Sequence, residues 1–123
     1  MHMGDDRYDY SHPRRLAKML ADFPGLVVIA AHFGGYQSWD EVPHYLLELP
    51  DLYFDTSSSL AFISRERARG LIDLIGEDRF FFGTDYPMWS PGEELDRFFD
   101  LGLTDAQNRK ILFDNFARLF HID

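Results

Sequence analysis

The chain has 123 residues, of which 46% are hydrophobic and 16% aromatic, and this composition excludes an intrinsically disordered protein. Twelve basic against twenty-one acidic side chains give a net charge of −9, which argues against a nucleic-acid partner. The absence of cysteine excludes a disulfide framework and a thiolate metal site, so any metal must be bound by histidine and carboxylate, and it favours a cytoplasmic location. No apolar run approaches about 20 residues, so we expect neither a membrane span nor a signal peptide.

Short apolar runs alternate with amphipathic segments along the chain, and this alternation predicts strands and helices in turn. Residues 1–10 are polar and glycine-rich, which predicts a loop after the stub of a strand. In chain order we then expect a helix capped by Ser11 and ended by Pro24–Gly25, followed by a strand over 26–31. The next helix is capped by Ser38 and runs through Leu49, with an early interruption at Pro43, and a strand over 52–55 follows it. After these we expect a helix over 60–75 closed by Gly76, a strand over 79–82, a helix from Pro91 to Gly102, and a last helix capped by Thr104. Repeats of this kind are βαβ units, which predict an α/β fold with a parallel sheet in a single domain, 1–123.

Four polar residues each follow directly after an apolar strand or strand stub: His2, His32, Asp55 and Asp85. Because the carboxyl ends of parallel strands meet at one edge of the sheet, we expect these side chains to converge there. Two imidazoles and a carboxylate suit a divalent transition metal such as zinc, iron or nickel. A metal lowers the pKa of a bound water, and an uncoordinated oxygen of Asp85 can shuttle the proton of that water.

Each of these residues also has a structural interpretation. Asp55 precedes a run of hydroxyl residues, and for it an Asx-turn is favoured over a functional role. A satisfied histidine before a tight Gly34–Gly35 turn explains His32 as well as a ligand does. His2 lies beside Met1, where a disordered end or an expression tag is an alternative.

The chain resembles the carboxyl-terminal part of the metal-dependent hydrolases of the amidohydrolase superfamily. The resemblance rests on A-H-F-G-G at 31–35 and F-G-T-D-Y-P at 82–87, together with the opening H-M-G-D and the tail K-I-L-F-D-N-F-A-R-L-F. It is closest to the amidohydrolase-related branch, which includes the aminocarboxymuconate-semialdehyde and resorcylate-type decarboxylases. The resemblance implies a (β/α)₈ barrel of the TIM-barrel type, of which this chain supplies roughly strands 5/6 to 8 with their helices, a half barrel.

The resemblance also implies a role for individual residues. His2, His32 and Asp85 match the metal ligands of the fifth, sixth and eighth strands, and Asp85 and His32 are the expected catalytic residues. The expected cofactor is a divalent metal ion, zinc first, with manganese, iron or nickel as alternatives. Asn115 matches a feature of the last helix that we interpret as structural.

The implied function is that of a metal-dependent hydrolase or decarboxylase acting on a small organic, carboxylated or cyclic substrate, through a metal-activated water or a metal-bound substrate. The first four strands of the family, with their H-x-H ligand pair, have no counterpart here, since such barrels need about 200 residues or more. The alternative is therefore a catalytically inactive half barrel that acts as an assembly or interaction module. In either case a homo-oligomer or a complementary barrel half is expected to cover the open sheet edges. A doubly wound domain binding an anionic ligand is disfavoured, because no strand is followed by a phosphate-binding fingerprint.

Overall fold

The computed structural model describes residues 1–123 and is organised around a sheet of three parallel strands in the order β1–β2–β3. The strands span Val28–Ala30, Leu52–Asp55 and Phe80–Phe81. β1 pairs with β2 in the register Ile29 to Tyr53, and β2 pairs with β3 in the register Phe54 to Phe80. The expected α/β class with a parallel sheet is confirmed, and the expected bounds of β2 match those observed.

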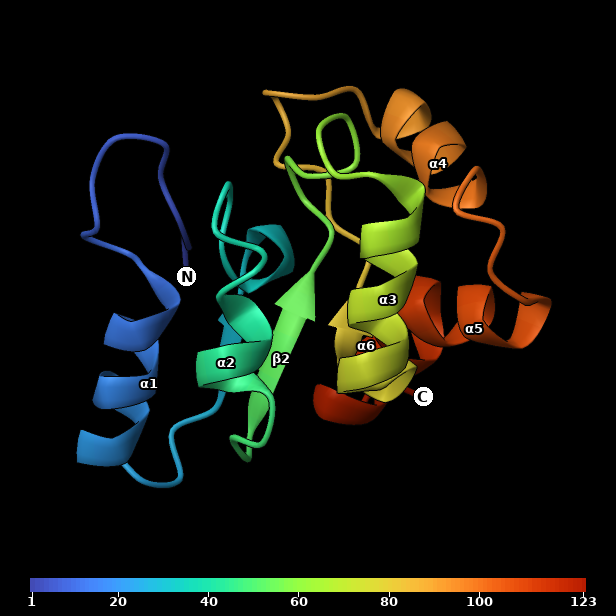
Figure 1. Cartoon of the computed structure of the whole chain (residues 1–123). Coiled ribbons are helices and arrows are strands. Elements are labelled where there is room, and N and C mark those ends of the chain that lie inside the picture. Colours follow the sequence, from blue (N-terminus) through green and yellow to red (C-terminus); the bar gives the residue numbers. More distant parts are fainter.

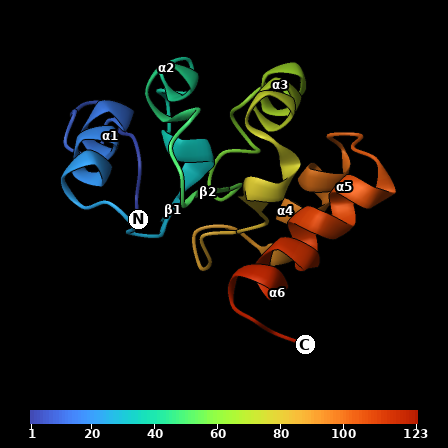
Figure 2. The same cartoon turned by 90° about the horizontal axis from the view of Figure 1, so that it is seen from below.

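Six α-helices accompany this sheet (Figure 1). They are α1 (Pro13–Asp22), α2 (Val42–Leu46), α3 (Arg65–Ile75), α4 (Pro91–Phe99), α5 (Asp105–Arg109) and α6 (Asn115–Leu119). Two 3₁₀ turns, η1 (His32–Gly34) and η2 (Glu77–Arg79), flank strands, and a π-helical segment, η3 (Lys110–Asp114), joins α5 to α6. Seen from below, α1, α2 and α3 stand in a row along the sheet, and α5 and α6 lie beyond α3 (Figure 2). None of these helices is both long and apolar enough to cross a membrane.

Residues 1–4, which were expected to lie in a loop, run beside β1 without forming a strand of their own. The amino group of Met1 donates to the Ile29 carbonyl at 2.8 Å, and the Ala31 N–H donates to the Met1 carbonyl at 2.9 Å. Gly4 then forms a parallel bridge with Tyr36. The second residue of the chain is thereby held at the carboxyl end of β1, next to His32.

Three of the expected helix starts are wrong. The N-cap of α1 is His12, whose Nδ1 accepts from the Arg14 N–H, whereas the Ser11 hydroxyl donates to the Gly4 carbonyl. α2 begins only at Val42 with Pro43 in its first turn, so this proline starts the helix instead of interrupting it, and Ser38 does not cap it.

The third wrong boundary is the start of α3, which begins at Arg65 after the N-cap Ser64 and not at residue 60. The preceding hydroxyl residues form turns because their side chains bond to nearby backbone and carboxylate groups. β1 is also shorter than expected, since Leu26 and Val27 are 43% and 51% exposed. By contrast, Gly76 does close α3, and Thr104 does cap α5 in a capping box with Gln107.

The hydrophobic core lies between the sheet and its helices. Phe33, Phe54 and Phe80 are fully buried there, and the Phe80 ring lies 5.4 Å from each of the other two. Burying each such ring contributes about 1.5–3 kcal/mol. Of the three consecutive phenylalanines in the expected strand, Phe80 and Phe81 are buried and Phe82 is half-buried after the strand has ended.

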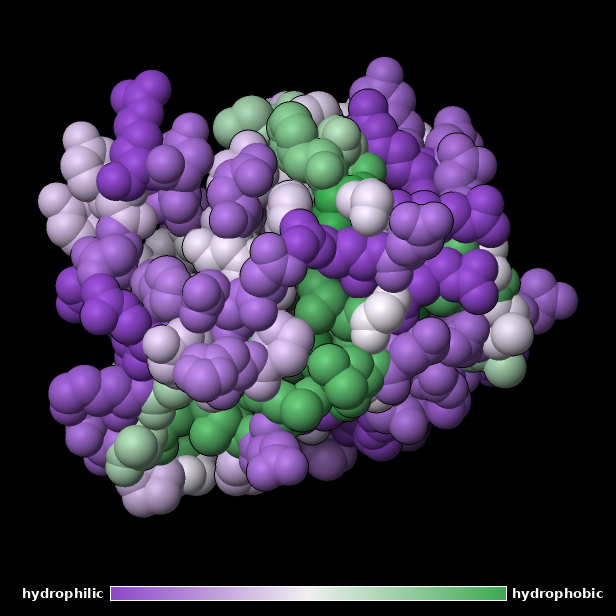
Figure 3. Space-filling view, in the orientation of Figure 1, coloured by the Kyte–Doolittle hydropathy of each residue, from purple (hydrophilic) through white to green (hydrophobic).

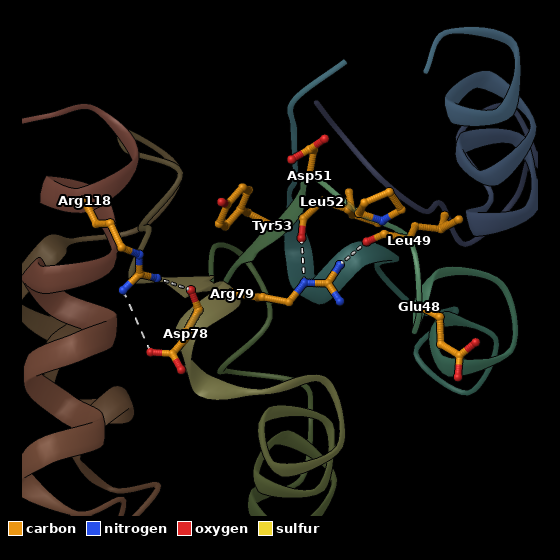
Figure 4. Close-up of a pocket in the computed structure, with 9 residues that line it drawn as sticks. Glu48, Leu49, Asp51, Leu52, Tyr53, Asp78, Arg79 and Arg118 are labelled. Atoms are coloured by element: carbon orange, nitrogen blue, oxygen red, sulfur yellow. Dashed lines mark hydrogen bonds and ion pairs between the residues drawn. The ribbon is translucent and has the colours of Figure 1, made fainter. Parts of the chain in front are cut away.

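The amino ends of the strands are held by polar side chains around a hollow of about 400 Å³ (Figure 4). The Arg79 guanidinium donates to the carbonyls of Leu47, Leu49 and Leu52 at 2.8–2.9 Å, so its hydrogen bonds are used within the fold. Burial lowers the pKa of Arg79, but a guanidinium stays protonated. Because this end holds backbone groups in place, we do not assign it a functional site.

Asn115 joins the last helix to β3. Its Nδ2 donates to the carbonyls of Glu77 and Phe80 at 2.7 and 2.8 Å, and the side chain is fully buried. The structural interpretation of Asn115 is therefore confirmed.

Hydrophobic side chains reach the surface along the seam between α2 and α3 (Figure 3). A shallow hollow of about 470 Å³ lies there, with Leu71, Leu74, Trp39 and Pro43 among its lining residues. An ion pair between Arg67 and Asp40 forms beside the hollow.

Candidate functional site

His32 lies in η1 at the carboxyl end of β1, and its side chain is only 4% exposed. Its Nδ1 lies 2.9 Å from the Ser57 carbonyl oxygen and 3.0 Å from Ser57 Oγ. A carbonyl only accepts, and the Ser57 hydroxyl proton points to Asp55 Oδ1 at 2.5 Å, so we assign the hydrogen to Nδ1 from this network. The Nε2 atom of His32 is then left with a free lone pair.

His2 has the opposite tautomer. Its Nε2 lies 2.9 Å from the Gly4 carbonyl oxygen, which again only accepts, so the hydrogen is on Nε2 and the lone pair on Nδ1. This Nδ1 lies 3.0 Å from His32 Nε2, with the two rings edge to face. The structure therefore brings two of the sequence-predicted ligands together.

Two lone pairs facing each other at 3.0 Å repel unless a proton or a cation lies between them. Tetrahedral zinc with zinc–nitrogen bonds of about 2.0–2.1 Å puts two histidine nitrogens of one site about 3.3 Å apart, close to this separation. Histidine ligands of metals also commonly donate their second N–H to a backbone carbonyl, as His2 and His32 do here. In donor type and in spacing, this pair fits a divalent metal.

Asp85 follows β3 and lines the same cavity of about 330 Å³ as His2 and His32. Its side chain is exposed, its backbone is left-handed with φ 60°, and its Oδ2 accepts from Ser58 Oγ at 2.7 Å. No three His, Asp or Glu side chains of the chain lie close enough together to hold one metal ion. Asp85 is thus on the cavity wall and not in ligating contact with the histidine pair.

Asp55 does form the expected Asx-turn, because its Oδ1 accepts from the Ser57 N–H at 2.9 Å. The same oxygen also accepts from the His32 backbone N–H at 3.1 Å. Asp55 therefore fixes both the backbone of His32 and, through Ser57, the orientation of its imidazole. The sequence showed the turn but not this second contact, which joins two strands.

The rest of the cavity wall is aromatic and was not identified from the sequence. Phe62 lies between Tyr36 and Trp89, with ring centroids 5.7 Å from each in edge-to-face geometry. Phe62 falls within the helix expected over 60–75, but it lies in a turn and is 50% exposed. Only their position in the sequence could have identified Tyr36, Phe62 and Trp89 as cavity residues, since they follow the ends of β1, β2 and β3.

The loop after His2 is fixed by its own acidic residues. Backbone N–H groups of Arg7 and Tyr8 donate to Asp5 Oδ1 and hold the pKa of Asp5 below its ordinary value. Hydrogen bonds from Arg15, together with those from Arg14, likewise lower the pKa of Asp9. The bonds from Arg14 and Arg15 to Asp9 anchor the loop to α1, so residues 1–4 are held at both ends.

Comparisons with known proteins show the family and the fold of the chain. A family model described as amidohydrolase matches residues 1–122, whereas no protein with curated annotation matches the chain. The fold is similar to that of an uncharacterised TIM-barrel protein from Bordetella bronchiseptica, with a TM-score of 0.83 and 27% identity over 99% of this chain.

Two further similar structures contain metals. One is a dihydroxybenzoic acid decarboxylase from Polaromonas sp. JS666 with bound manganese and the inhibitor 2-nitroresorcinol (TM-score 0.69, 22% identity, 90% of this chain). The other is an amidohydrolase from Burkholderia multivorans with bound zinc (TM-score 0.74, 14% identity, 90% of this chain). The chain spans 44%, 39% and 49% of the lengths of these three structures, in the order given.

Proposed function

This chain belongs to the amidohydrolase family, and from that premise we propose that it is part of a metal-dependent hydrolase or decarboxylase. Its substrate is a small organic molecule, carboxylated or cyclic. The observation that supports the proposal most directly is the His2–His32 pair, whose two facing lone pairs at 3.0 Å require a cation or a shared proton. The bound manganese and zinc of the similar structures are in line with a divalent metal.

Residues 1–123 act, in this proposal, as one α/β domain that supplies roughly strands 5/6 to 8 of a (β/α)₈ barrel. The parallel order β1–β2–β3 and the hydrogen bonds of residues 1–4 beside β1 support this assignment. Candidate ligands then come from the ends of three different strands, as is usual for active sites on this fold.

His2 and His32 are the proposed ligands that already face each other, and Asp85, which lies on the wall of the same cavity outside ligating contact with them, is the proposed third ligand. Zinc, manganese, iron and nickel all accept this donor set. A divalent metal supplies Lewis-acid chemistry when bound, polarising a substrate oxygen. Asp85 acts as the general base through Oδ1, since its Oδ2 already accepts the Ser58 proton. Asp55 and Ser57 hold His32 in the tautomer that keeps Nε2 free.

The aromatic part of the cavity serves to bind the substrate. Tyr36, Phe62 and Trp89 form a continuous wall of rings beside the histidine pair. Such a wall orients a flat or cyclic molecule by stacking and excludes water from the reacting groups.

The second candidate function is a catalytically inactive half barrel that acts as an assembly module. A specific observation favours it: a hollow of about 450 Å³ beside β1 is lined entirely by five hydrophobic residues, which are Met1, Val27, Ile29, Leu119 and Phe120. Met1, Val27 and Phe120 are 58%, 51% and 49% exposed. Exposed apolar surface of this kind is suited to a homo-oligomer or to a complementary barrel half.

Native mass spectrometry and metal analysis of the purified full chain test both functions. We expect one divalent metal per chain in the wild type and none in His32→Ala, whereas His44→Ala, which changes an exposed histidine on α2, keeps its metal. A folded wild-type chain that binds no added zinc or manganese would contradict the enzyme proposal. If such a chain also forms a defined dimer, the assembly module is the better description.

A further inference from the structure

We infer that Ser58 and Trp89 are positioning residues for Asp85, holding its carboxylate at the wall of the cavity with one defined oxygen free. This inference rests on the proposed function, in which Asp85 is both ligand and base. It goes beyond that proposal because neither Ser58 nor Trp89 is a candidate ligand. The two residues come from different segments, the turn after β2 and the loop before α4.

The hydrogen bonds run in one direction. Trp89 Nε1 lies 3.0 Å from Ser58 Oγ, and an indole N–H only donates, so the Ser58 oxygen accepts. The single hydroxyl proton of Ser58 is then directed to Asp85 Oδ2, 2.7 Å away. Trp89 thus sets the rotation of the hydroxyl, and the hydroxyl sets the rotation of the carboxylate.

Asp85 depends on this contact because its side chain has no other hydrogen-bond partner in the fold. It is exposed on a loop, and both Asp85 and Ser58 have left-handed backbones, with φ 60° and φ 49°. Non-glycine residues rarely adopt this conformation, and when they do they concentrate at functional sites. The Ser58 contact therefore decides which carboxylate oxygen faces the cavity.

Trp89 is itself fixed from the side of α4. The Arg97 guanidinium lies over its ring at 5.3 Å from the centroid, and Arg97 Nη1 pairs with Glu94 Oε1 at 2.5 Å. Glu94 is only 1% exposed, and a carboxylate is rarely buried to this extent unless it is paired, as it is here with Arg97. Phe62 contacts the same indole ring edge-on. Trp89 is therefore held from two sides before it reaches Ser58.

The test uses the full chain, with Mn²⁺ alone as the probe and three variants. Ser58→Ala removes the hydroxyl, Trp89→Phe keeps the ring but removes the N–H, and Ser90→Ala is the control, since Ser90 is exposed and makes no side-chain cap bond. We expect Ser58→Ala to weaken Mn²⁺ binding by about 10–100-fold, the usual effect of removing a group that orients a ligand. Trp89→Phe should give a smaller loss in the same direction, and Ser90→Ala none.

The second readout requires neither metal nor substrate. The indole N–H resonance of Trp89, identified by its loss in Trp89→Phe, should shift in Ser58→Ala and also in Asp85→Ala, but not in Ser90→Ala. Ser58→Gly serves as a second variant, because glycine adopts the backbone φ of 49° at this position without strain.

The outcomes separate this inference from the proposed function. An indole resonance that stays in place in both Ser58 variants overturns the inference, and so does unchanged Mn²⁺ affinity where the wild type binds the ion. If the wild type binds no Mn²⁺, the proposed function fails, and the indole resonance alone then decides whether Ser58 links Trp89 to Asp85.

Discussion

His32 Nε2 and His2 Nδ1 face each other at 3.0 Å, and each is the nitrogen that its own ring leaves without a hydrogen. If a divalent metal bridges these atoms, replacing either residue with alanine removes half of the imidazole donors. We expect His2→Ala and His32→Ala to bind less than one-tenth as much Zn²⁺ per chain as the wild type after dialysis. Metal analysis together with calorimetric titration measures this.

The matched control is His44→Ala, which replaces an imidazole that is exposed on α2, away from the cavity. It should bind Zn²⁺ as the wild type does. Equal Zn²⁺ content in all four proteins would mean that the metal is bound elsewhere and that the histidine pair only shares a proton.

Asp55→Ala tests whether the turn after β2 positions His32. The change removes the acceptor for the His32 and Ser57 backbone N–H groups, so the free energy of unfolding should fall by about 1–3 kcal/mol. Metal affinity should fall by about 10–100-fold, because the His32 backbone and the Ser57 residue that orients its imidazole are no longer held in place.

Asp73→Ala is the comparison for Asp55→Ala, since Asp73 is exposed on α3 and makes no hydrogen bond or ion pair. Chemical denaturation and Zn²⁺ titration of both variants give the two quantities. A variant at Asp55 that loses stability but keeps full Zn²⁺ affinity would limit this residue to a turn-forming role.

Much of this fold follows from local sequence patterns. The apolar run before His32 and the strand over 52–55 correctly predicted two strands of the parallel sheet. Gly76 correctly predicted the end of α3, and Thr104 the start of α5. Some of the misplaced helix starts lie where a side chain bonds to an unexpected backbone group. Ser11, for example, donates to Gly4 instead of capping α1, which local spacing does not reveal.

The candidate site also has parts that the sequence could predict and parts that it could not. The proximity of His2 and His32 could be predicted, because both were expected to follow parallel strands whose carboxyl ends meet at one edge of the sheet. Their facing lone pairs could not, because these depend on the carbonyls of Gly4 and Ser57. The buried Glu94 was equally hidden, since in sequence it resembles any acidic residue in the first turn of a helix.

Gly4→Ala should disrupt the site without touching a ligand. Gly4 has φ 81°, and a Cβ atom there would overlap the backbone N and O of Tyr36, so the bridge between them must open. The Gly4 carbonyl, which accepts the hydrogen bond from His2 Nε2, is displaced when this bridge opens. We expect a loss of stability of about 1–3 kcal/mol and strongly reduced Zn²⁺ binding.

Gly70→Ala is the opposite case on the same chain. Gly70 lies inside α3, and a Cβ atom there meets nothing within 4 Å. Alanine in a helix interior should raise the free energy of unfolding by about 0.5–1 kcal/mol and leave Zn²⁺ binding unchanged. Thermal unfolding of the two variants compares them directly, and a harmless Gly4→Ala would show that the Gly4–Tyr36 bridge does not hold His2.

The pH dependence of stability should change when Glu77 is replaced, because this residue ties η2 to the last helical segments. Gln107 Nε2 and Lys110 Nζ each donate to its carboxylate at 3.1 Å, and these bonds, the first being the larger cause, hold the pKa of Glu77 below its ordinary value. A lowered folded-state pKa stabilises the fold above the unfolded pKa, and this contribution is lost as the pH falls through the folded value.

At neutral pH, Glu77→Gln should therefore have a lower free energy of unfolding than the wild type. As the pH is lowered from about 6 to about 3, its free energy of unfolding should fall by less than that of the wild type. Asp5 and Asp9 also have a lowered pKa, but they are present in both proteins, so the difference between the two curves isolates Glu77. Urea unfolding at a series of pH values measures both curves, with Glu48→Gln as a control at an exposed carboxylate that makes no hydrogen bond. Parallel curves for the wild type and Glu77→Gln would mean that the bonds from Gln107 and Lys110 do not stabilise the folded state, and the attachment of the last helix would then rest on Asn115 and the packing of Ile111.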